Sequence, residues 1–206
     1  MTTRVLRGDN AYLRNALGAA RLAGVTSVTL GTTAADLPYR KNNNQRDVQR
    51  YAIGADGEFD AFGDIAVWNV YGQYGETNTH ELLRDIMNTN AMNLASDAVF
   101  APNGSIVCRS TLTSPSNGCQ PLNLLGRGVA SAEAIDYVLG DPYRDQKLQQ
   151  TVAGVNLSVS PFATWAGDVS VAVGGEYRKE EVSGSVPEEF RTGWSVGNFL
   201  PTFGSY

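Results

Sequence analysis

The chain has 206 residues, and its 16 Lys and Arg against 21 Asp and Glu give a net charge of -5. This acidic balance argues against a nucleic-acid-binding protein, which needs a basic surface to neutralise phosphates. A single histidine, His80, excludes metal sites that are built from several histidines. The sequence has no apolar run of about 18 residues that could form a transmembrane helix, and its first residues lack the apolar core of a signal peptide.

The first expected element is a short helix over Asn10–Ala23, which ends just before a glycine. Two strands are expected next, at Gln49–Phe59 and Ile65–Thr77, because their side chains alternate in character with a period of two. The short segment Asp60–Asp64 is expected to form the turn between them. These two strands and their turn predict a hairpin.

A long polar stretch, Asn78–Lys147, separates this hairpin from the next predicted strands. Within it we expect helices at His80–Met92 and Ser131–Leu139. A hairpin is expected at Asp97–Arg109, because Asn103 and Gly104 form a dipeptide that favours tight turns. Apolar residues at helical spacing in the two helices predict that these loop segments pack on one another.

The two cysteines, Cys108 and Cys119, flank a segment rich in Ser, Thr, Pro, Asn and Gly, which is typical of a loop. Without partner histidines they cannot form a zinc site. They are either bridged or two free thiols in a reducing compartment. We expect the bridge, which would stabilise the fold by about 2–3 kcal/mol and which requires an oxidising compartment outside the cytoplasm.

A second pair of alternating strands is expected at Thr151–Ser160 and Val169–Glu180, joined by a turn within Pro161–Asp168. Each predicted strand is about as long as a tilted strand that crosses a membrane, and longer than the usual strand of about 5–6 residues in soluble proteins. The connections between the predicted strands alternate between short turns and long loops, as they do in outer-membrane barrels. The fold class predicted is all-β: a partial antiparallel transmembrane β-barrel of about four long strands, with long extracellular loops that contain short helices.

The alternation assigns two faces to the predicted strands. One face is largely free of formal charge and is expected to meet lipid; it comprises Tyr51, Ile53, Phe59, Trp68, Val70, Tyr74, Val155, Leu157, Val159, Val169, Val171, Val173 and Tyr177. The opposite face is polar and is expected to line the lumen; it comprises Arg50, Asp56, Glu58, Asn69, Gln73, Asn156, Glu176 and Arg178. A soluble β-sandwich also has alternating strands and remains the alternative at this point.

The sequence contains no pattern that predicts an enzyme. There is no G-x-S-x-G elbow, no P-loop and no G-x-G-x-x-G motif. His80 is expected to be solvated or to cap a helix, and the carboxylates of Asp56, Glu58 and Glu176 are expected to line a wet interior rather than to form a glycosidase pair. We therefore expect no catalytic residue, no metal site and no cofactor.

Three stretches of the sequence resemble the barrel of TonB-dependent outer-membrane receptors. They read RDVQRYAIGADGEF followed by WNVYGQYGE, then SDAVFAPNGSIVCRSTLTSPSNGCQPLNLLG, and then VSVAVGGEYRKE. The resemblance implies a 22-stranded barrel around a plug domain, with Asn78–Lys147 as an extracellular loop and the two short turns on the periplasmic side. It also implies the outer membrane of a Gram-negative bacterium as the location, outer-membrane lipid as the surroundings, and the TonB complex as the partner that acts through the plug.

The sequence also departs from this family. It lacks the plug, the TonB-contacting segment and the closing aromatic strand, so residues 1–206 are expected to be an internal fragment of a single barrel domain. About four strands cannot close a barrel, since bacterial barrels begin at eight. The expected function is part of an active-transport receptor that imports a bulky nutrient, such as an iron–siderophore, a carbohydrate or a cobalamin-type compound. The alternatives are a secreted soluble β-sandwich binding module and a fragment of a passive porin.

Overall fold

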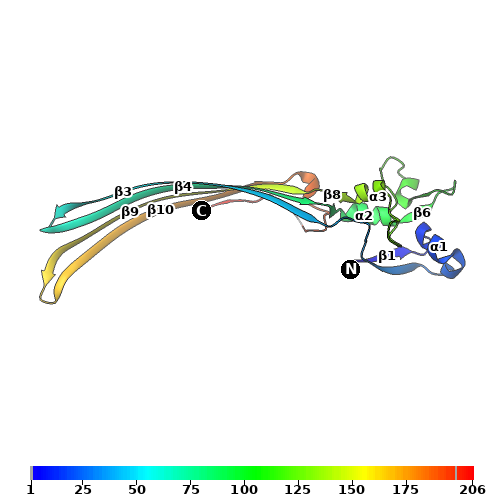
Figure 1. The fold of residues 1–206 in the computed structure, drawn as a ribbon, viewed down its shortest axis with the longest axis horizontal. Coiled ribbons are helices and arrows are strands. Elements are labelled where there is room, and N and C mark those ends of the chain that lie inside the picture. Colours follow the sequence, from blue (N-terminus) through cyan, green and yellow to red (C-terminus); the bar gives the residue numbers. More distant parts are fainter. Residues whose placement is uncertain (1, 198) are drawn as a thin grey trace. The chain divides into compact units, whose positions relative to one another are not determined.

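The computed structural model describes residues 2–197 and 199–206, which are 54% strand and 16% helix, with the strands mostly antiparallel (Figure 1). The chain divides into two compact units. Unit 1 comprises Met1–Asn43, Leu82–Tyr143 and Pro187–Phe199, and unit 2 comprises Asn44–Glu81, Arg144–Val186 and Leu200–Tyr206. The predicted β-rich class is confirmed, whereas the single barrel domain stays a prediction.

Unit 2 is built on one sheet of five strands in the order β11-β10-β9-β4-β3. Their bounds are β3 Lys41–Ala61, β4 Asp64–Arg84, β9 Tyr143–Thr164, β10 Gly167–Ser185 and β11 Phe203–Ser205. In Figure 1 the β3–β4 and β9–β10 hairpins lie side by side in a single layer, with both tight turns at the same end of the sheet. The predicted antiparallel pairing of the last two long strands is confirmed by the register from Gly167↔Thr164 to Ser185↔Asp145.

Both predicted turns are present and tight. Phe62 and Gly63 alone separate β3 from β4, and both have positive φ (58° and 83°), as a type I′ hairpin turn requires. Trp165 and Ala166 separate β9 from β10. The turns lie within the two segments predicted from the sequence, and the strands start closer to the turn centres than expected.

The four long strands have 19–22 residues each, nearly twice the predicted lengths. Most of the extra length is at the ends remote from the turns, for example at 41–47, where both faces of the strand are polar. A period of two in hydrophobicity cannot reveal a strand whose two faces are equally polar, because pairing then depends only on the backbone. The predicted helix at His80–Met92 is consequently wrong at its start, since His80–Arg84 continues β4.

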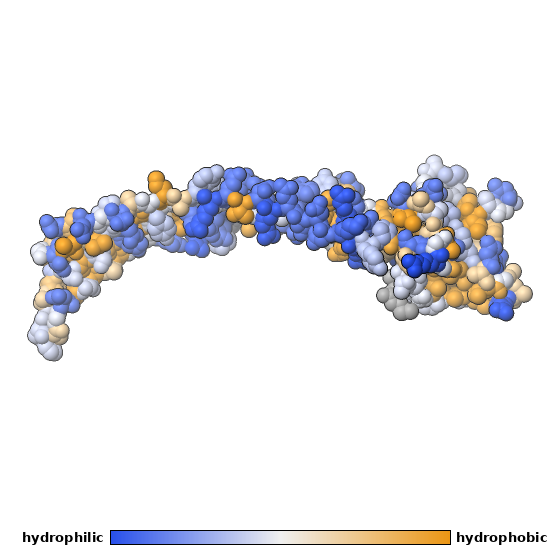
Figure 2. All heavy atoms as spheres, in the orientation of Figure 1, coloured by the Kyte–Doolittle hydropathy of each residue, from blue (hydrophilic) through white to orange (hydrophobic). Residues whose placement is uncertain are grey.

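The sheet of unit 2 has almost no buried core. Large apolar side chains are open to the surroundings, with 81% of Ile53 and 65% of Val173 exposed. The buried residues of this unit are few, namely Ala66, Thr79, Val152 and Val186. Figure 2 shows apolar residues gathered at the turn end of the strands and hydrophilic residues along much of their remaining length.

Unit 1 begins with an antiparallel pair, β1 (Thr2–Arg7) and β2 (Ser27–Thr32), with register from Thr2↔Thr32 to Arg7↔Ser27. Helix α1 spans Ala11–Leu17 and is followed by the short 3-10 helix η1, Ala19–Leu22. The N-cap is Asn10, whose side chain accepts from the backbone N–H of Leu13 at 3.1 Å. The helix predicted at Asn10–Ala23 therefore exists but is interrupted at Gly18, where a φ of 83° is incompatible with helix continuation.

The connection between β4 and β9 contains most of the remaining elements of unit 1. They are β5 Ile86–Met87, α2 Thr89–Ser96, β6 Ala98–Phe100, β7 Ile106–Cys108, η2 Arg109–Leu112, α3 Ala132–Val138 and β8 Leu139–Gly140. β5 pairs with β8, and a last 3-10 helix, η3, spans Glu188–Phe190. The predicted α3 and the predicted Asp97–Arg109 hairpin are both confirmed, the latter with Gly104 at a φ of 83° in its turn.

Helix α2 overlaps the predicted helix His80–Met92 only at residues 89–92 and continues to Ser96. It starts after Asn88, whose side chain accepts from the backbone N–H groups of Asn90 and Ala91. Asp85 precedes β5 with a φ of 59°, so the chain turns sharply between β4 and β5. The apolar residues Leu82, Leu83 and Ile86 therefore follow an extended chain rather than one helix face.

Unit 1 has a packed core, formed where α2 and α3 meet the loop that follows the disulfide. Its buried members are Met92, Ala95, Leu122, Leu124, Ala134 and Val138. The expectation that the loop helices pack on one another is confirmed by these contacts. No helix among the described residues is long and apolar enough to cross a membrane.

Candidate functional site

The polar face of the sheet carries a row of hydrogen bonds that crosses four strands. The guanidinium of Arg50 donates to the side-chain oxygen of Gln73 (2.5 Å), and Gln73 donates to Gln150 (3.4 Å). Gln150 donates in turn to the carboxylate of Glu180 (2.7 Å), which also accepts from the hydroxyl of Tyr206 (2.9 Å). These five side chains line a hollow of about 960 Å³ in unit 2. The row joins residues that are up to 156 positions apart in a single polar surface.

A second polar group lies closer to the turns on the same face. Asn156 donates to Asn69 (2.9 Å), and the hydroxyl of Tyr71 donates to Glu176 (2.8 Å), whose other oxygen lies 3.4 Å from Arg178. The structure thus brings together six of the eight residues that were expected to line a lumen. Whether this face meets a lumen stays a prediction.

The other two residues of the expected lumen set, Asp56 and Glu58, lie on β3 with the same parity as Arg50. Both are exposed, and among the described residues no hydrogen bond or ion pair joins them to the polar groups of β4, β9 or β10. No arrangement of a catalytic carboxylate pair follows from their positions. Among the described residues there is also no group of three His, Cys, Asp or Glu side chains that could hold a metal ion.

The opposite face collects the residues that were expected to meet lipid. Val171 pairs with Val159 and Val173 pairs with Leu157 across β9 and β10, so these side chains share one face. On the other hairpin, a Cβ at Gly57 would lie 2.9 Å from the ring of Trp68, so the odd positions of β3 share a face with Trp68. Most large side chains of this face are exposed, and the whole predicted set falls on it: Tyr51, Ile53, Phe59, Trp68, Val70, Tyr74, Val155, Leu157, Val159, Val169, Val171, Val173 and Tyr177.

Sequence analysis missed one large member of this face. The register changes between Val169 and Val171, and the extra residue lies in β9 at Pro161. Past this bulge the parity of β9 is reversed, so Phe162 lies opposite Val169 with 60% of its surface exposed. Pro161, directly after the predicted strand Thr151–Ser160, is the sequence signal that could have indicated the bulge.

The apolar character of this face ends before the strands do. Beyond Tyr74 the same face of β4 carries Glu76, which forms an ion pair with Lys147 (3.0 Å) and accepts a hydrogen bond from the hydroxyl of Tyr74 (2.7 Å). Further along β10, Lys179 pairs with Glu181 at 2.8 Å. The face is therefore an apolar band near the turns that continues into a charged extension.

The predicted disulfide between Cys108 and Cys119 is present, with an S–S distance of 2.06 Å. Both cysteines are buried, and the bridge closes the loop that follows the β6–β7 hairpin. Next to it, the guanidinium of Arg109 donates to the carboxylates of Asp9 (2.6 Å) and Asp97 (3.0 Å). The ion cluster joins Asp9, just before α1, to the β6–β7 hairpin, and the bridge joins that hairpin to the loop after it.

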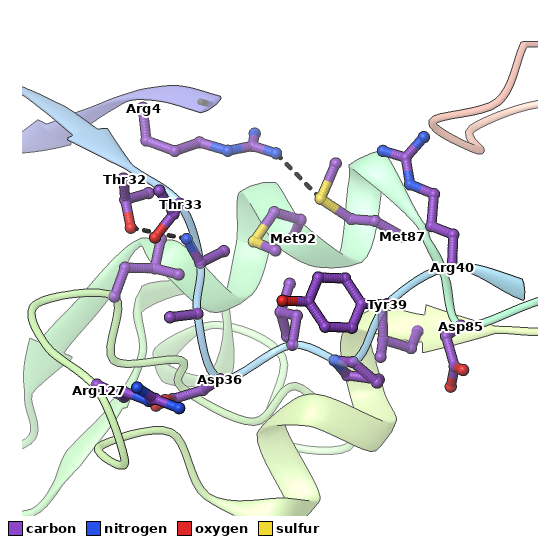
Figure 3. A pocket seen from close by; sticks show the side chains of 16 residues that line it. Arg4, Thr32, Thr33, Asp36, Tyr39, Arg40, Asp85, Met87, Met92 and Arg127 are labelled. Carbon is purple, nitrogen blue, oxygen red and sulfur yellow. Dashed lines mark hydrogen bonds between the residues drawn. The ribbon is translucent and has the colours of Figure 1, made fainter.

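Unit 1 contains a pocket of about 930 Å³ that sequence analysis did not predict (Figure 3). Segment 32–40 forms one wall, and β1, β5, α2 and β8 contribute Arg4, Met87, Met92 and Leu139. The wall is held by a loop-to-loop contact in which Asp36 accepts from three successive backbone N–H groups, at residues 128–130, at 2.6–2.9 Å. These donors hold the pKa of Asp36 below its ordinary value, with the bond from Gly128 as the largest cause.

The charges around this pocket are unequally compensated. Asp85 pairs with Lys41 at 3.4 Å, and the oxygens of Asp36 are taken by backbone donors. Arg4 donates to the side-chain oxygen of Asn93 (3.0 Å) and to the sulfur of Met87 (3.3 Å), as Figure 3 shows for the latter. Partial burial lowers the pKa of Arg4, and no carboxylate of the described residues lies within salt-bridge distance of it.

Comparison with known proteins gives no assignment for these features. No protein-family model matches the chain, and no curated protein is significantly similar to it.

Proposed function

We propose that the sheet of unit 2 is part of the wall of an outer-membrane β-barrel, with its apolar band against lipid and its polar face toward the lumen. The parent protein would be an active-transport receptor that imports a bulky nutrient with energy supplied through TonB. The observation that carries this proposal is the apolar band itself, which is exposed on a single-layer sheet, with 81% of Ile53 and 53% of Val155 accessible. In water such a surface favours aggregation, whereas in lipid it is the stable arrangement.

The two faces support a membrane wall over a soluble sandwich. A sandwich needs a second sheet about 10 Å from the first, against which one face is buried. Here the side chains that would form that core are exposed, and the opposite face is linked by hydrogen bonds from Arg50 to Tyr206. A concave polar surface opposite an apolar band is typical of a water-filled barrel interior.

The dimensions of the band also support the proposal. Val169 and Tyr177 mark its extent on β10, eight residues apart. At about 3.3 Å per residue this is roughly 26 Å along the strand, or about 19 Å along the normal at a tilt of about 45°, which approaches the apolar band of about 25 Å in outer-membrane barrels. Aromatic side chains lie at the turn end as well, with Phe62 and Trp165 exposed by 80% and 101%. The charged extension around Glu76 and Lys147 would then project beyond the bilayer.

The proposal requires further strands beside this sheet. Within residues 2–197 and 199–206, β3 has one unpaired edge along its length, and β11 covers β10 only at Glu181–Ser183. Unpaired backbone groups in hydrocarbon cost several kcal/mol each, so both edges must pair within the membrane. The energised transport, the TonB partner and the ligand class come from the family resemblance alone. A passive porin would share the same wall, and a plug domain encoded in the parent gene would separate the two.

The membrane location can be tested by fluorescence quenching with brominated lipids. Trp68 lies on the apolar band, whereas Trp194 packs on Phe190 in unit 1 at a ring distance of 5.6 Å. A variant that keeps only Trp68 (W165F/W194F) should be quenched in vesicles of brominated phosphatidylcholine. The matched variant that keeps only Trp194 (W68F/W165F) should retain its emission. Equal emission from Trp68 in brominated and ordinary vesicles would overturn the proposed location.

A further inference from the structure

We propose that the pocket of unit 1 binds an organic anion, namely a carboxylate attached to an apolar or aromatic body. The inference depends on unit 1 alone and is independent of the proposed membrane location of unit 2. It starts from a cavity of about 930 Å³, which is at the upper end of the range for small-molecule sites.

The cationic side of the pocket is under-compensated. Arg4, Arg40 and Arg127 line it together with Asp36 and Asp85. Both carboxylates already have partners: Asp36 accepts three backbone N–H groups, and Asp85 pairs with Lys41, which is not a lining residue. Figure 3 shows the Asp85 carboxylate pointing away from the guanidinium of Arg40. Among the described residues, neither Arg4 nor Arg40 has a carboxylate within 4.0 Å.

Arg4 is the stronger indication that the pocket binds an anion. A guanidinium has five N–H donors in a planar fork that matches a carboxylate, whereas thioether sulfur is a weak acceptor. Arg4 is half-buried and uses one donor on the amide oxygen of Asn93 and another on the sulfur of Met87. A carboxylate that replaced the sulfur would supply charge and geometry that the protein itself does not supply.

The rest of the pocket is suited to an apolar body. Met87, Met92, Leu37, Leu124 and Leu139 line it, and all five belong to the core of unit 1 or pack against that core. Methionine side chains adapt to irregular and aromatic surfaces because they are flexible and polarizable. The Tyr39 side chain, which is 91% exposed, adds an aromatic surface to the lining. Apolar lining with a few fixed charges is the usual composition of a site for an amphipathic small molecule.

The probe pair that tests this inference is 2-naphthoate and 2-naphthamide, which have nearly the same shape and differ in charge. Binding to the full chain is measured by equilibrium dialysis, with the same neutral detergent on both sides. We expect saturable binding of the acid and affinity for the amide weaker by about tenfold or more, since hydrogen bonds to charged groups contribute about 1.5–3 kcal/mol. Equal affinities, or no saturable binding of the acid, would overturn the inference.

Substitutions then test which arginine side chains bind the carboxylate of the probe. Arg4→Met and Arg40→Met should each weaken binding of the acid by about tenfold, and Arg4→Lys should have an intermediate effect because lysine lacks the planar fork. Arg21→Met, on the exposed η1 outside the pocket, is the matched control and should bind like the unsubstituted chain. Unchanged affinity in both methionine variants would contradict the assignment. If Arg4→Met fails to fold, Arg40→Met and the acid-to-amide ratio still decide it.

Discussion

The two units of this chain differ in where they place their large apolar side chains. In unit 1, Met92, Leu122 and Val138 are at most 2% exposed and pack between helices and loops. In unit 2, Ile53, Val155 and Val173 are 53–81% exposed on a sheet one layer thick. Unit 1 therefore stabilises itself by burying its apolar side chains, whereas unit 2 presents its apolar side chains to the surroundings.

This difference indicates where the stability of each unit originates. Burial of apolar surface contributes about 25 cal/mol per Å², but only where that surface is removed from water. The strands of unit 2 obtain little of this contribution from their own fold, so a lipid phase or a partner must supply it. The following predictions test the contrast, from the largest expected effect to the smallest.

The core of unit 1 should be the most sensitive to truncation. Leu122→Ala should lower the free energy of unfolding by about 2–5 kcal/mol, because it leaves a cavity at a fully buried position. The matched change in unit 2, Ile53→Ala, should cost less than this, because 81% of Ile53 is exposed in the fold and its truncation leaves no cavity. In the W68F/W165F background, urea unfolding followed by Trp194 fluorescence measures the first, and circular dichroism of the strands measures the second. Similar costs at both positions would remove the distinction between the units.

The sheet of unit 2 should tolerate an introduced charge on its polar face and not on its apolar face. Val171→Arg should lower the stability of the chain in phosphatidylcholine vesicles by about 2–4 kcal/mol, the cost of a charge near the bilayer centre. Ser170→Arg is the matched control, since its hydroxyl lies 3.0 Å from that of Ser160 on the opposite face. The vesicle-bound fraction after dilution from urea measures both. Equal bound fractions would show that the two faces do not meet different solvents.

The disulfide should stabilise unit 1 selectively. Replacing Cys108 and Cys119 together with serine should lower the unfolding free energy of unit 1 by about 2–3 kcal/mol, the loop-closure entropy for a separation of 11 residues. The strand signal of unit 2 should be unchanged, because the bridge lies outside its sheet. Reductant should reproduce the effect in the unsubstituted chain and leave the double variant unaffected. A loss of strand signal on reduction would argue that the units do not unfold separately.

Asp36 should give unit 1 a modest dependence on pH. Its pKa is lowered in the folded state by the three backbone donors, so its contribution is fully present above the ordinary value near 3.8. As the pH falls below that value, the unfolded state binds the proton more readily, and the contribution is lost when the folded carboxyl is protonated. Asp36→Asn should therefore be less stable than the unsubstituted chain at pH 7, with the gap narrowing towards pH 2. A stability difference between Asp36→Asn and the unsubstituted chain that does not change with pH would show that the substitution acts through packing and not through the charge of Asp36.

Several elements could be predicted because their cause is local. The alternation of Tyr51 and Ile53 with small or charged neighbours predicted β3, the Asn103-Gly104 pair predicted the β6–β7 turn, and the two cysteines predicted their own bridge. The extension of the strands beyond these patterns could not be predicted, since both faces are polar there. Likewise, Leu82, Leu83 and Ile86 have helical spacing in the sequence, but strand pairing overrides that local preference.

The candidate pocket, in contrast, could not be predicted from local sequence patterns. Arg4 and Arg40 lie 36 positions apart, and Met87 and Leu139 are farther along the chain, so no motif joins them. Their meeting depends on the pairing of β1 with β2, on the packing of α2 against α3, and on the contact of Asp36 with the loop at 128–130. The charge imbalance of the pocket depends on which of its acidic side chains form hydrogen bonds or ion pairs in the fold. The sequence alone does not reveal these pairings.

The sequence by itself determined the β-rich class, the two tight turns, the two-faced strands and the disulfide, because each depends on neighbouring residues or on a single possible pair. Only the tertiary structure decided how far the strands extend, where the bulge at Pro161 reverses the parity, and which distant side chains form the polar row and the pocket. These features depend on pairing and packing between segments that are remote in the chain, where long-range contacts outweigh local preference.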